Sequence, residues 1–189
     1  MRALETIVKE LETRFGVISH REQRRDLGEV NIASQHVVAA LEWLKRHGGY
    51  KHLTHLSVVD WLEDGEFQLT YLLTDPYAHH SLMLCTRIER ENARAETIFT
   101  LWPEAVTYEQ EINEMYGIDF PGSPRQGVEF LLEGWNDMPP MRRDFDTVKY
   151  CEDTYDFRPG REHVDPKEVR AKFQAEQKRL KAENTESPQ

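Results

Sequence analysis

The chain has 189 residues, 39% of them hydrophobic, which is enough to bury one core and leaves room for appended segments. Its formal net charge of −10 at pH 7 argues against sequence-independent nucleic-acid binding and against docking on an anionic membrane surface, because both depend on basic patches. Two distant cysteines, Cys85 and Cys151, do not make a disulfide framework, so we expect both to be reduced thiols in a cytosolic-type compartment.

The beginning of the chain carries no apolar run of the kind found in signal peptides, so no secretory leader is predicted. The longest apolar stretches are well short of the roughly 20 residues that span a bilayer. We therefore expect a soluble protein, which can still belong to a membrane-attached assembly.

A first helix is predicted over residues 2–15, where apolar side chains recur at three- and four-residue steps and Gly16 follows at a position that ends helices. Val17–His20 and Glu29–Ile32 are short strand candidates on either side of the charged run Arg21–Asp26. The N-terminal part is therefore expected to join a helix to two short strands.

A second helix is expected from Ser34, a suitable N-cap, to about His47, before Gly48-Gly49 ends it. Three strand-like segments rich in Leu, Val, Thr and Tyr follow: Leu53–Trp61, Phe67–Thr74 and Ser81–Glu89. The turn residues Glu63-Asp64-Gly65 predict a hairpin between the first two. Helices, then a strand meander, then more helix indicate an α+β fold with a small, mostly antiparallel sheet and packed helices.

An acidic helix is predicted near residue 110, with Pro103 at its first position and Gly117 as its left-handed cap. One side of this helix is apolar, and its acidic residues lie mostly on the others: Glu104, Glu109, Glu111 and Glu114. The simplest interpretation is a solvated amphipathic helix. A cation site is the alternative, although helical spacing scatters the carboxylates around the cylinder.

The segment from Gly134 to Gly160 shows no sustained period of a helix or a strand. Irregular connections longer than about 15 residues are usually functional or disordered, and disordered segments are poor in aromatic residues. This segment instead carries aromatic residues together with Met and Arg, the types enriched in interface cores. We expect an extended arm that lies on a partner protein. The alternative is that the arm folds back over its own domain.

A further helix is predicted from Asp165-Pro166 to about Lys181, with a thin apolar stripe, and residues 184–189 are expected to be disordered. The predicted organisation is an α+β globular domain (1–122), an extended partner-wrapping arm (123–160), and an exposed helix with a tail (161–189).

The sequence lacks the common catalytic and metal-binding motifs. The histidines of His52-Leu53-Thr54-His55 and of His79-His80 point to opposite faces of a strand, so neither pair is a good chelate. Cys85 lies in an apolar strand and is expected to be a buried hydrophobic residue. No Cys-x-x-Cys, Walker loop, dinucleotide-binding turn or nucleophile elbow is present. These absences argue against an independent enzyme, and no catalytic, cofactor-binding or metal-binding residue is assigned.

Three blocks of residues form a specific pattern: Trp102-Pro103-Glu104-Ala105, then Tyr108-Glu109-Gln110-Glu111-Ile112 with Met115-Tyr116-Gly117-Ile118, Phe120 and Gly122, and then Pro140-Met141-Arg142-Arg143-Asp144-Phe145. Together they resemble the signature of one family, the small hydrophilic peripheral-arm subunit of respiratory complex I and of related membrane-bound, energy-converting hydrogenases that pump ions. The specific match covers residues 102–145.

The resemblance implies a non-catalytic, cofactor-free structural subunit of the peripheral arm, on the cytoplasmic side of the cell membrane and attached to it only through partners. The implied partners are the large catalytic subunit, with a nickel–iron centre or part of a quinone site, and an iron–sulfur subunit. Nickel–iron and iron–sulfur cofactors are expected in those partners. The interface residues predicted on this basis are Tyr108, Glu109, Glu111, Met115, Trp135, Pro140, Met141, Arg142, Arg143, Asp144 and Phe145.

The chain departs from the complex I pattern after Gly122, where Ser123-Pro124-Arg125-Gln126 replaces a His-Pro and Leu-Arg-Arg run. These differences favour the [NiFe]-hydrogenase or ferredoxin-linked branch. The alternative within the family is the equivalent subunit of an NADH/quinone oxidoreductase (complex I). A small stand-alone metal-dependent enzyme that uses the acidic helix, and a regulatory adaptor without redox chemistry, are the alternatives of other classes.

Overall fold

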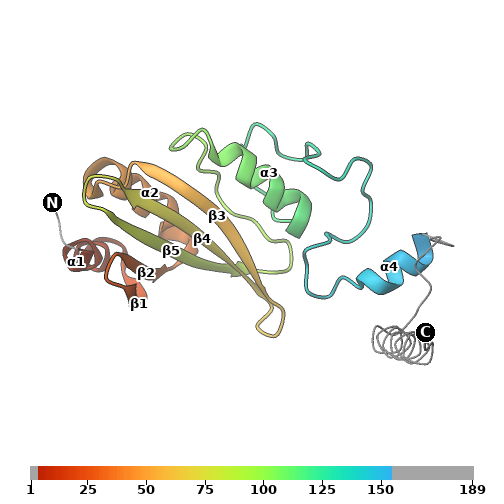
Figure 1. Cartoon of the computed structure of the whole chain (residues 1–189), viewed down its shortest axis with the longest axis horizontal. Coiled ribbons are helices and arrows are strands. Elements are labelled where there is room, and N and C mark those ends of the chain that lie inside the picture. Colours follow the sequence, from red (N-terminus) through yellow and green to blue (C-terminus); the bar gives the residue numbers. More distant parts are fainter. Residues whose placement is uncertain (1–3, 155–189) are drawn as a thin grey trace, which may run out of the picture. The chain divides into compact units, whose positions relative to one another are not determined.

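The structure is a computed structural model that describes residues 4–154 of the chain (Figure 1). The chain forms two compact units that divide between Phe145 and Asp146. Residues 123–145 of the predicted arm therefore belong to the same compact unit as the globular domain. The helix predicted from Asp165 and the predicted tail lie outside the described residues.

The first unit is built on one sheet with the strand order β1-β2-β5-β4-β3. The strands are β1 (Val17–Arg24), β2 (Leu27–Ile32), β3 (His52–Trp61), β4 (Glu66–Asp75) and β5 (His80–Glu89). Neighbouring strands are antiparallel except β2 and β5, which run parallel because the chain passes from β2 through helix α2 to the far edge before it returns. The predicted α+β fold with a mostly antiparallel sheet is confirmed.

The meander β3–β4–β5 follows the predicted segments within one residue at each end. In β4, exposure alternates along the whole strand, so one face carries the buried residues Phe67, Leu69, Tyr71 and Leu73. This period of two is the pattern of a strand with one face on the core. Trp61 and Glu66 pair at the end of the β3–β4 hairpin, which confirms the predicted turn between them.

The two short strands predicted on either side of the charged run Arg21–Asp26 are longer in the structure and take in most of that run. Strand β1 continues to Arg24, and a tight turn leads directly into β2. β1 is an edge strand whose side chains are almost all exposed, so charged residues are tolerated there. Across the strand pair, Arg21 Nη2 lies 3.2 Å from the Glu29 carboxylate.

Helix α1 (Leu4–Phe15) and helix α2 (Val37–Trp43) bury apolar side chains in the core that the sheet provides. The prediction that Ser34 caps the second helix is wrong. A short 3-10 turn (Ser34–His36) precedes α2, and Ala33 stands before it without a side-chain cap. After α2, a π-helical turn (Leu44–Gly48) leads to Gly49, whose φ of 92° confirms the predicted helix end.

Helix α3 (Ala105–Tyr116) packs beside β3, the edge strand of the sheet (Figure 1). It begins later than predicted, because Pro103 belongs to the turn that precedes it. Gly117 ends the helix with a φ of 71°, and its N–H donates to the carbonyl oxygen of Asn113 at 2.9 Å, as predicted for a left-handed cap.

The second unit contains helix α4 (Thr147–Thr154), in a region where the sequence predicted no helical period. The signal that could have found it is Asp146, whose carboxylate accepts hydrogen bonds from the N–H groups of Val148 and Lys149, both at 3.0 Å. This is an ordinary N-cap, and it was hidden among the prolines and aromatic residues of the segment.

Candidate functional site

Polar side chains of α3 hold the segment that follows it, residues 123–145, which we call the arm segment. The Glu114 carboxylate accepts backbone hydrogen bonds of 2.7 to 3.2 Å from three successive N–H groups, those of Phe130, Leu131 and Leu132. Gln110 Nε2 donates to the carbonyl oxygens of residues 128 and 129, at 3.3 and 2.8 Å. The arm segment has no helix or strand of its own, so these side chains supply hydrogen bonds that regular structure would otherwise make.

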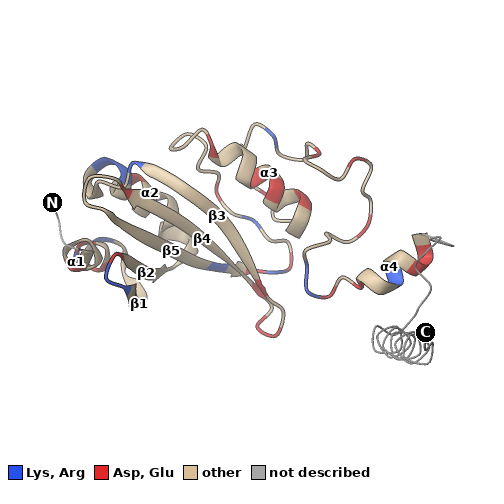
Figure 2. Ribbon diagram, viewed as in Figure 1, with Lys and Arg blue, Asp and Glu red and all other residues tan. Residues whose placement is uncertain are grey.

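Glu109 of α3 is buried, with 1% of its surface exposed. Its carboxylate accepts a hydrogen bond from the backbone N–H of Ile98 at 2.8 Å and one from the hydroxyl of Thr97 at 2.7 Å. The predicted solvated acidic face is therefore wrong at this position. Glu109 and Glu114 are occupied by internal contacts, which leaves α3 poorly suited to the alternative of a cation site. Figure 2 shows how the acidic residues are distributed along the helix.

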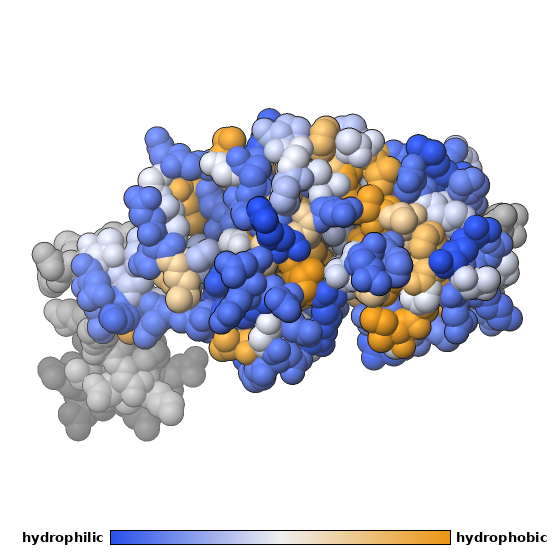
Figure 3. Space-filling view, turned by 180° about the vertical axis from the view of Figure 1, so that it is seen from behind, coloured by the Kyte–Doolittle hydropathy of each residue, from blue (hydrophilic) through white to orange (hydrophobic). Residues whose placement is uncertain are grey.

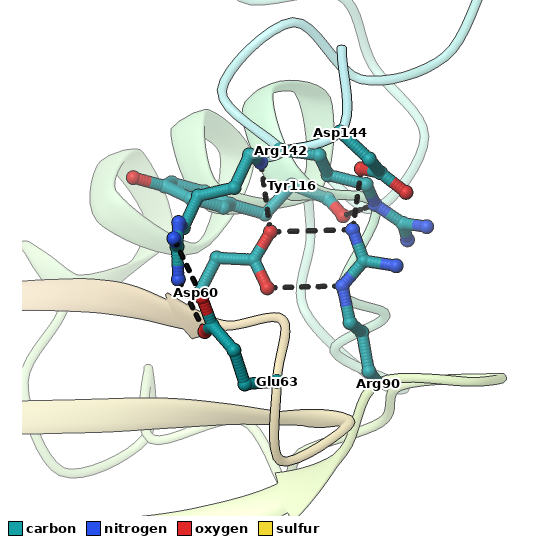
Figure 4. Close-up of polar contacts among 7 residues, drawn as sticks. Asp60, Glu63, Arg90, Tyr116, Arg142 and Asp144 are labelled. Carbon is teal, nitrogen blue, oxygen red and sulfur yellow. Dashed lines mark hydrogen bonds and ion pairs between the residues drawn. The ribbon is translucent and has the colours of Figure 1, made fainter.

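A charged cluster joins the end of the arm segment to the sheet (Figure 4). Arg90, just after β5, donates to both oxygens of Asp60 at 2.9 and 3.2 Å and to Asp144 at 2.5 Å. Asp60 also accepts the backbone N–H of Arg143 at 2.9 Å. The Arg143 guanidinium in turn donates to both oxygens of Glu63 at 2.5 and 2.8 Å. The buried Asp60 carboxylate thus ties strand β3 to the end of β5 and to the arm segment, and the exposed Glu63 ties the hairpin to the arm segment.

The electrostatics of the charged cluster follow from these contacts. Hydrogen bonding to Asp60, and then to Asp144, raises the pKa of Arg90. The same bond from Arg90 lowers the pKa of Asp144. The mutual bonds of Glu63 and Arg143 lower the pKa of the first and raise that of the second. Every shift favours the charged form, so the cluster is suited to fixing a backbone rather than to moving a proton.

Arg142 lies beside the charged cluster, at the end of α3. Its Nε donates to the carbonyl oxygen of Tyr116 at 2.7 Å, and its guanidinium stands 5.4 Å from the centre of the Phe67 ring. The backbone N–H of Met141 donates to the carbonyl oxygen of Met115 at 3.0 Å. These contacts satisfy carbonyl groups at the end of the helix that have no partner within it.

Exposed large hydrophobic side chains gather on the arm segment, and we call this set the apolar strip. Its exposed fractions run from 39% to 72%, and its members are Val128, Phe130, Leu131, Met138 and Met141. Figure 3 shows one face of the molecule, on which apolar patches stand among mostly hydrophilic residues. Because the backbone of the strip is bound to α3, its side chains are presented on a fixed surface.

The predicted interface residues lie in two regions. Tyr108 and Glu109 face the domain itself, since the Tyr108 hydroxyl donates to the carbonyl oxygen of Thr54 at 3.2 Å and Glu109 is buried. Further along α3, Glu111 is exposed and Met115 is half-buried. The remaining predicted residues belong to the arm segment: Trp135, Pro140, Met141, Arg142, Arg143, Asp144 and Phe145.

Two of these residues contact each other. The rings of Trp135 and Phe145 lie 5.7 Å apart between centroids, and both are half-buried within the first unit. For residues 123–145, the structure therefore agrees with the alternative prediction, in which the arm folds back over its own domain. That a partner covers this surface stays a prediction.

Sequence reasoning missed Asp60 and Arg90, on which the charged cluster depends. Each is a single charged residue near the end of a strand, without a recognisable motif around it. Their partners in the arm segment, Asp144 for Arg90 and Arg143 for Asp60, lie more than 50 positions further along the chain. The available signal was Asp60 itself, an acidic residue in an otherwise apolar and aromatic strand end.

None of the helices described between residues 4 and 154 combines the length and the apolar character that a membrane span requires. Over the same residues, no group of three or more His, Cys, Asp or Glu side chains could hold a metal ion.

Known proteins similar to this chain are subunits of respiratory complexes. It is 30% identical over 138 residues to the NADH-quinone oxidoreductase subunit designated C from Hyphomonas neptunium, a match that covers 69% of this chain and just under two thirds, 66%, of the relative. The protein of the same name from Rhizobium rhizogenes is 28% identical over 170 residues, covering 86% of this chain and 82% of that protein.

Two solved structures share the fold. A chain of the membrane-bound sulfane sulfur reductase, described as an archaeal respiratory membrane complex, superposes with a TM-score of 0.77 at 25% identity, covering 86% of this chain and 96% of that one. A trypsin-resistant fragment of Nqo5 superposes with a TM-score of 0.58 at 20% identity, covering 65% of this chain and 98% of the fragment, and this likeness concerns the fold alone.

The family model described as "Respiratory-chain NADH dehydrogenase, 30 Kd subunit" matches residues 30–151, more than half of the chain. This range includes the three sequence blocks between Trp102 and Phe145, so the resemblance found in the sequence is confirmed. The chain belongs to the family of the 30 kDa subunit of respiratory-chain NADH dehydrogenase, a family of subunits of membrane-bound respiratory complexes.

Proposed function

We propose that this chain is a non-catalytic structural subunit in the peripheral arm of a membrane-anchored, ion-translocating redox complex. In this role it docks on the large catalytic subunit through the apolar strip and the adjoining end of the arm segment. An iron–sulfur subunit is the second expected neighbour. The chain holds no cofactor of its own, and nickel–iron or iron–sulfur groups belong to the partners on the cytoplasmic side of the membrane.

The apolar strip is the observation that supports docking most strongly. Five large hydrophobic side chains stand out from one short segment, although scattered single exposures are the ordinary case on a monomer surface. The hydrogen bonds from Glu114 and Gln110 hold the backbone beneath them. A surface fixed before binding loses little conformational entropy on association, which favours a stable interface.

A structural likeness and a sequence difference both favour one branch of the family. The likeness to a chain of the membrane-bound sulfane sulfur reductase, which covers 96% of that chain, favours the hydrogenase-type or ferredoxin-linked branch. The departure from the complex I pattern after Gly122 points the same way. The second candidate is the equivalent subunit of an NADH/quinone oxidoreductase, which the names of the curated relatives favour.

The docking proposal is tested by purifying the tagged full-length chain from its native cells and identifying the co-purifying proteins by mass spectrometry. The test variant replaces Leu131 and Met141, exposed by 72% and 56%, with serine. The matched control is Ile18→Ser, which removes a side chain of the same class, exposed by 72%, from the edge strand β1.

We expect the Leu131→Ser/Met141→Ser variant to lose most of the co-purified large subunit while its isolated chain melts at the wild-type temperature. Exposed apolar side chains contribute little to the stability of the free domain but become buried in an interface. Equal recovery of the large subunit with the variant and with Ile18→Ser would show that the apolar strip is not the docking surface.

The branch is tested on the same purified complex. A nickel-containing or ferredoxin-linked large subunit supports the first candidate, and NADH-dependent quinone reduction by the complex supports the second. Neither activity is expected from the chain alone.

A further inference from the structure

An open pocket of about 480 Å³ lies between the residues that follow β5 and the end of α3. It is lined by Arg90, Glu91, Asn92, Ala93, Gly117, Asp119 and Arg142. One of its lining residues, Arg142, directly follows Met141 of the apolar strip in the sequence, and the whole pocket lies within the first compact unit. A partner that covers Met141 would therefore lie within one residue of the pocket lining.

Two guanidinium groups stand close together at the pocket, but among residues 4–154 only that of Arg90 makes ion pairs. Arg90 is bound by Asp60 and Asp144. Arg142 makes one hydrogen bond through Nε, to a backbone carbonyl oxygen, and no ion pair with any residue between 4 and 154. In Figure 4 its terminal nitrogens point away from the Asp60 carboxylate.

The surroundings of Arg142 disfavour its charge. Burial, and then the nearby charge of Arg90, lowers the pKa of the Arg142 guanidinium, and the charges of Asp144 and Asp60 offset this lowering only in part. Both guanidiniums also stand over the Phe67 ring, at 5.6 and 5.4 Å from its centre, so the two cations share one aromatic ring. An anion in direct contact with this partly buried guanidinium would offset the cost of its desolvation more fully than the two carboxylates that already act on it from a distance.

Gly117 keeps the terminal nitrogens of Arg142 uncovered. A Cβ at this position would lie 2.9 Å from Nη2 of Arg142 and 3.1 Å from Cγ of Pro139. Any side chain here would displace the guanidinium or cover it. The helix end thus leaves a guanidinium edge, with donors in a planar fork, accessible from the pocket.

We infer that this pocket receives a side-chain carboxylate of the partner subunit, which pairs with Arg142 when the complex assembles. This inference rests on the proposed docking function and names the partner chemistry at that site. The planar fork of an arginine matches a carboxylate in a two-bond arrangement. Glu91 and Asp119 also line the pocket, and their negative charges oppose a dianionic phosphate more than a single carboxylate.

The test uses zero-length carbodiimide cross-linking, which joins an amine to a carboxylate in direct contact. The Arg142→Lys variant keeps a positive charge and provides the amine. Arg94→Lys is the matched control, because Arg94 is also near Asp119 but is 69% exposed and outside the pocket lining. Cross-links are located by mass spectrometry in the purified complex and in the isolated full chain.

We expect Arg142→Lys to form a cross-link to an Asp or Glu of the large subunit in the complex, whereas Arg94→Lys forms none. We also expect Arg142→Gln to weaken binding of the large subunit at least tenfold, and Arg94→Gln to change it less than twofold. Melting of the isolated variants shows whether the fold is retained. If Arg142→Gln fails to fold, the cross-link of Arg142→Lys decides alone.

Cross-links from Arg142→Lys to acids of this chain only, including those beyond residue 154, overturn the inference. Unchanged affinity of a folded Arg142→Gln variant overturns it as well. In either case, loss of binding by Leu131→Ser/Met141→Ser leaves the docking function standing. If no large subunit binds the wild-type chain, the docking function and the pocket inference both fall.

Discussion

Replacing Asp60 with asparagine removes the negative charge at the centre of the charged cluster while it keeps the size of the side chain. The Asp60 side chain is only 2% exposed and that of Arg90 is 14% exposed, so the ion pair between them is shielded from water. The Asp60 carboxylate accepts three hydrogen bonds, two from the Arg90 guanidinium and one from the Arg143 N–H. In asparagine, an NH2 group takes the place of one acceptor oxygen, so this donor faces the guanidinium or the Arg143 N–H.

The expected loss follows from the burial of the pair. Removing one partner of a buried ion pair costs about 3–5 kcal/mol, because the other charge stays buried without compensation. Arg90 keeps its contact with Asp144, so the lower end, about 3 kcal/mol, applies. For a chain of this size such a loss lowers Tm by about 6–12 °C.

Urea unfolding of the full chain, followed by tryptophan fluorescence, measures the change in the free energy of unfolding. Limited trypsin digestion provides a second measurement, since release of the Arg143 backbone is expected to speed cleavage after Arg142 and Arg143. Glu63→Gln is the control: it breaks an exposed ion pair with Arg143, and we expect no measurable change in Tm.

The reasoning is refuted if Asp60→Asn unfolds within about 0.5 kcal/mol of the wild type, which is the range of ordinary surface substitutions. A stability loss without faster cleavage would contradict a narrower point, that Asp60 holds the arm segment in place. A loss of equal size in Glu63→Gln would show that the burial of the Asp60–Arg90 pair does not set the size of the effect.

Two further predictions concern single positions. Burial raises the pKa of the Cys85 thiol. Iodoacetamide is therefore expected to alkylate the exposed Cys151 in the native chain, and Cys85 only after denaturation. If peptide mass spectrometry finds both cysteines modified under native conditions, the described core is contradicted. Gly117→Ala forces an L side chain to a φ of 71° and against Arg142, whereas Gly127→Ala meets the same φ penalty, at 70°, with no atom within 4 Å. Urea unfolding should therefore show a loss larger by about 1 kcal/mol for Gly117→Ala, and equal losses would mean that Arg142 does not occupy this position.

The meander and the helix ends could be predicted because their signals are local. In β4, alternation of apolar residues fixes which face is buried, whatever the strand pairs with. The predicted ends at Gly49 and Gly117 are confirmed, because a positive φ at the end of a helix is favourable for glycine and costly for most other residues. The family signature is also local, because it consists of three short blocks of residues between Trp102 and Phe145.

The contacts of the acidic helix could not be predicted in the same way. Helical spacing distributes Glu109, Glu111 and Glu114 around the cylinder, but it does not say which neighbour each one meets. The structure places Glu109 against the N–H of Ile98 and Glu114 against the arm segment, and leaves Glu111 exposed. A carboxylate with these backbone partners is satisfied when buried, so an acidic residue does not by itself indicate a solvated face.

By itself, the sequence determined the α+β class, the strand meander, the family and the unusual composition of the arm, because periodicity and short motifs are properties of neighbouring residues. The tertiary structure alone decided that residues 123–145 fold onto the domain. It also decided that Asp60 anchors the backbone of Arg143, 83 positions away, and that Arg142, beside its pocket, makes no direct ion pair with residues 4–154. Such pairings depend on which strand ends and helix ends meet in space, and no local pattern in the chain encodes that meeting.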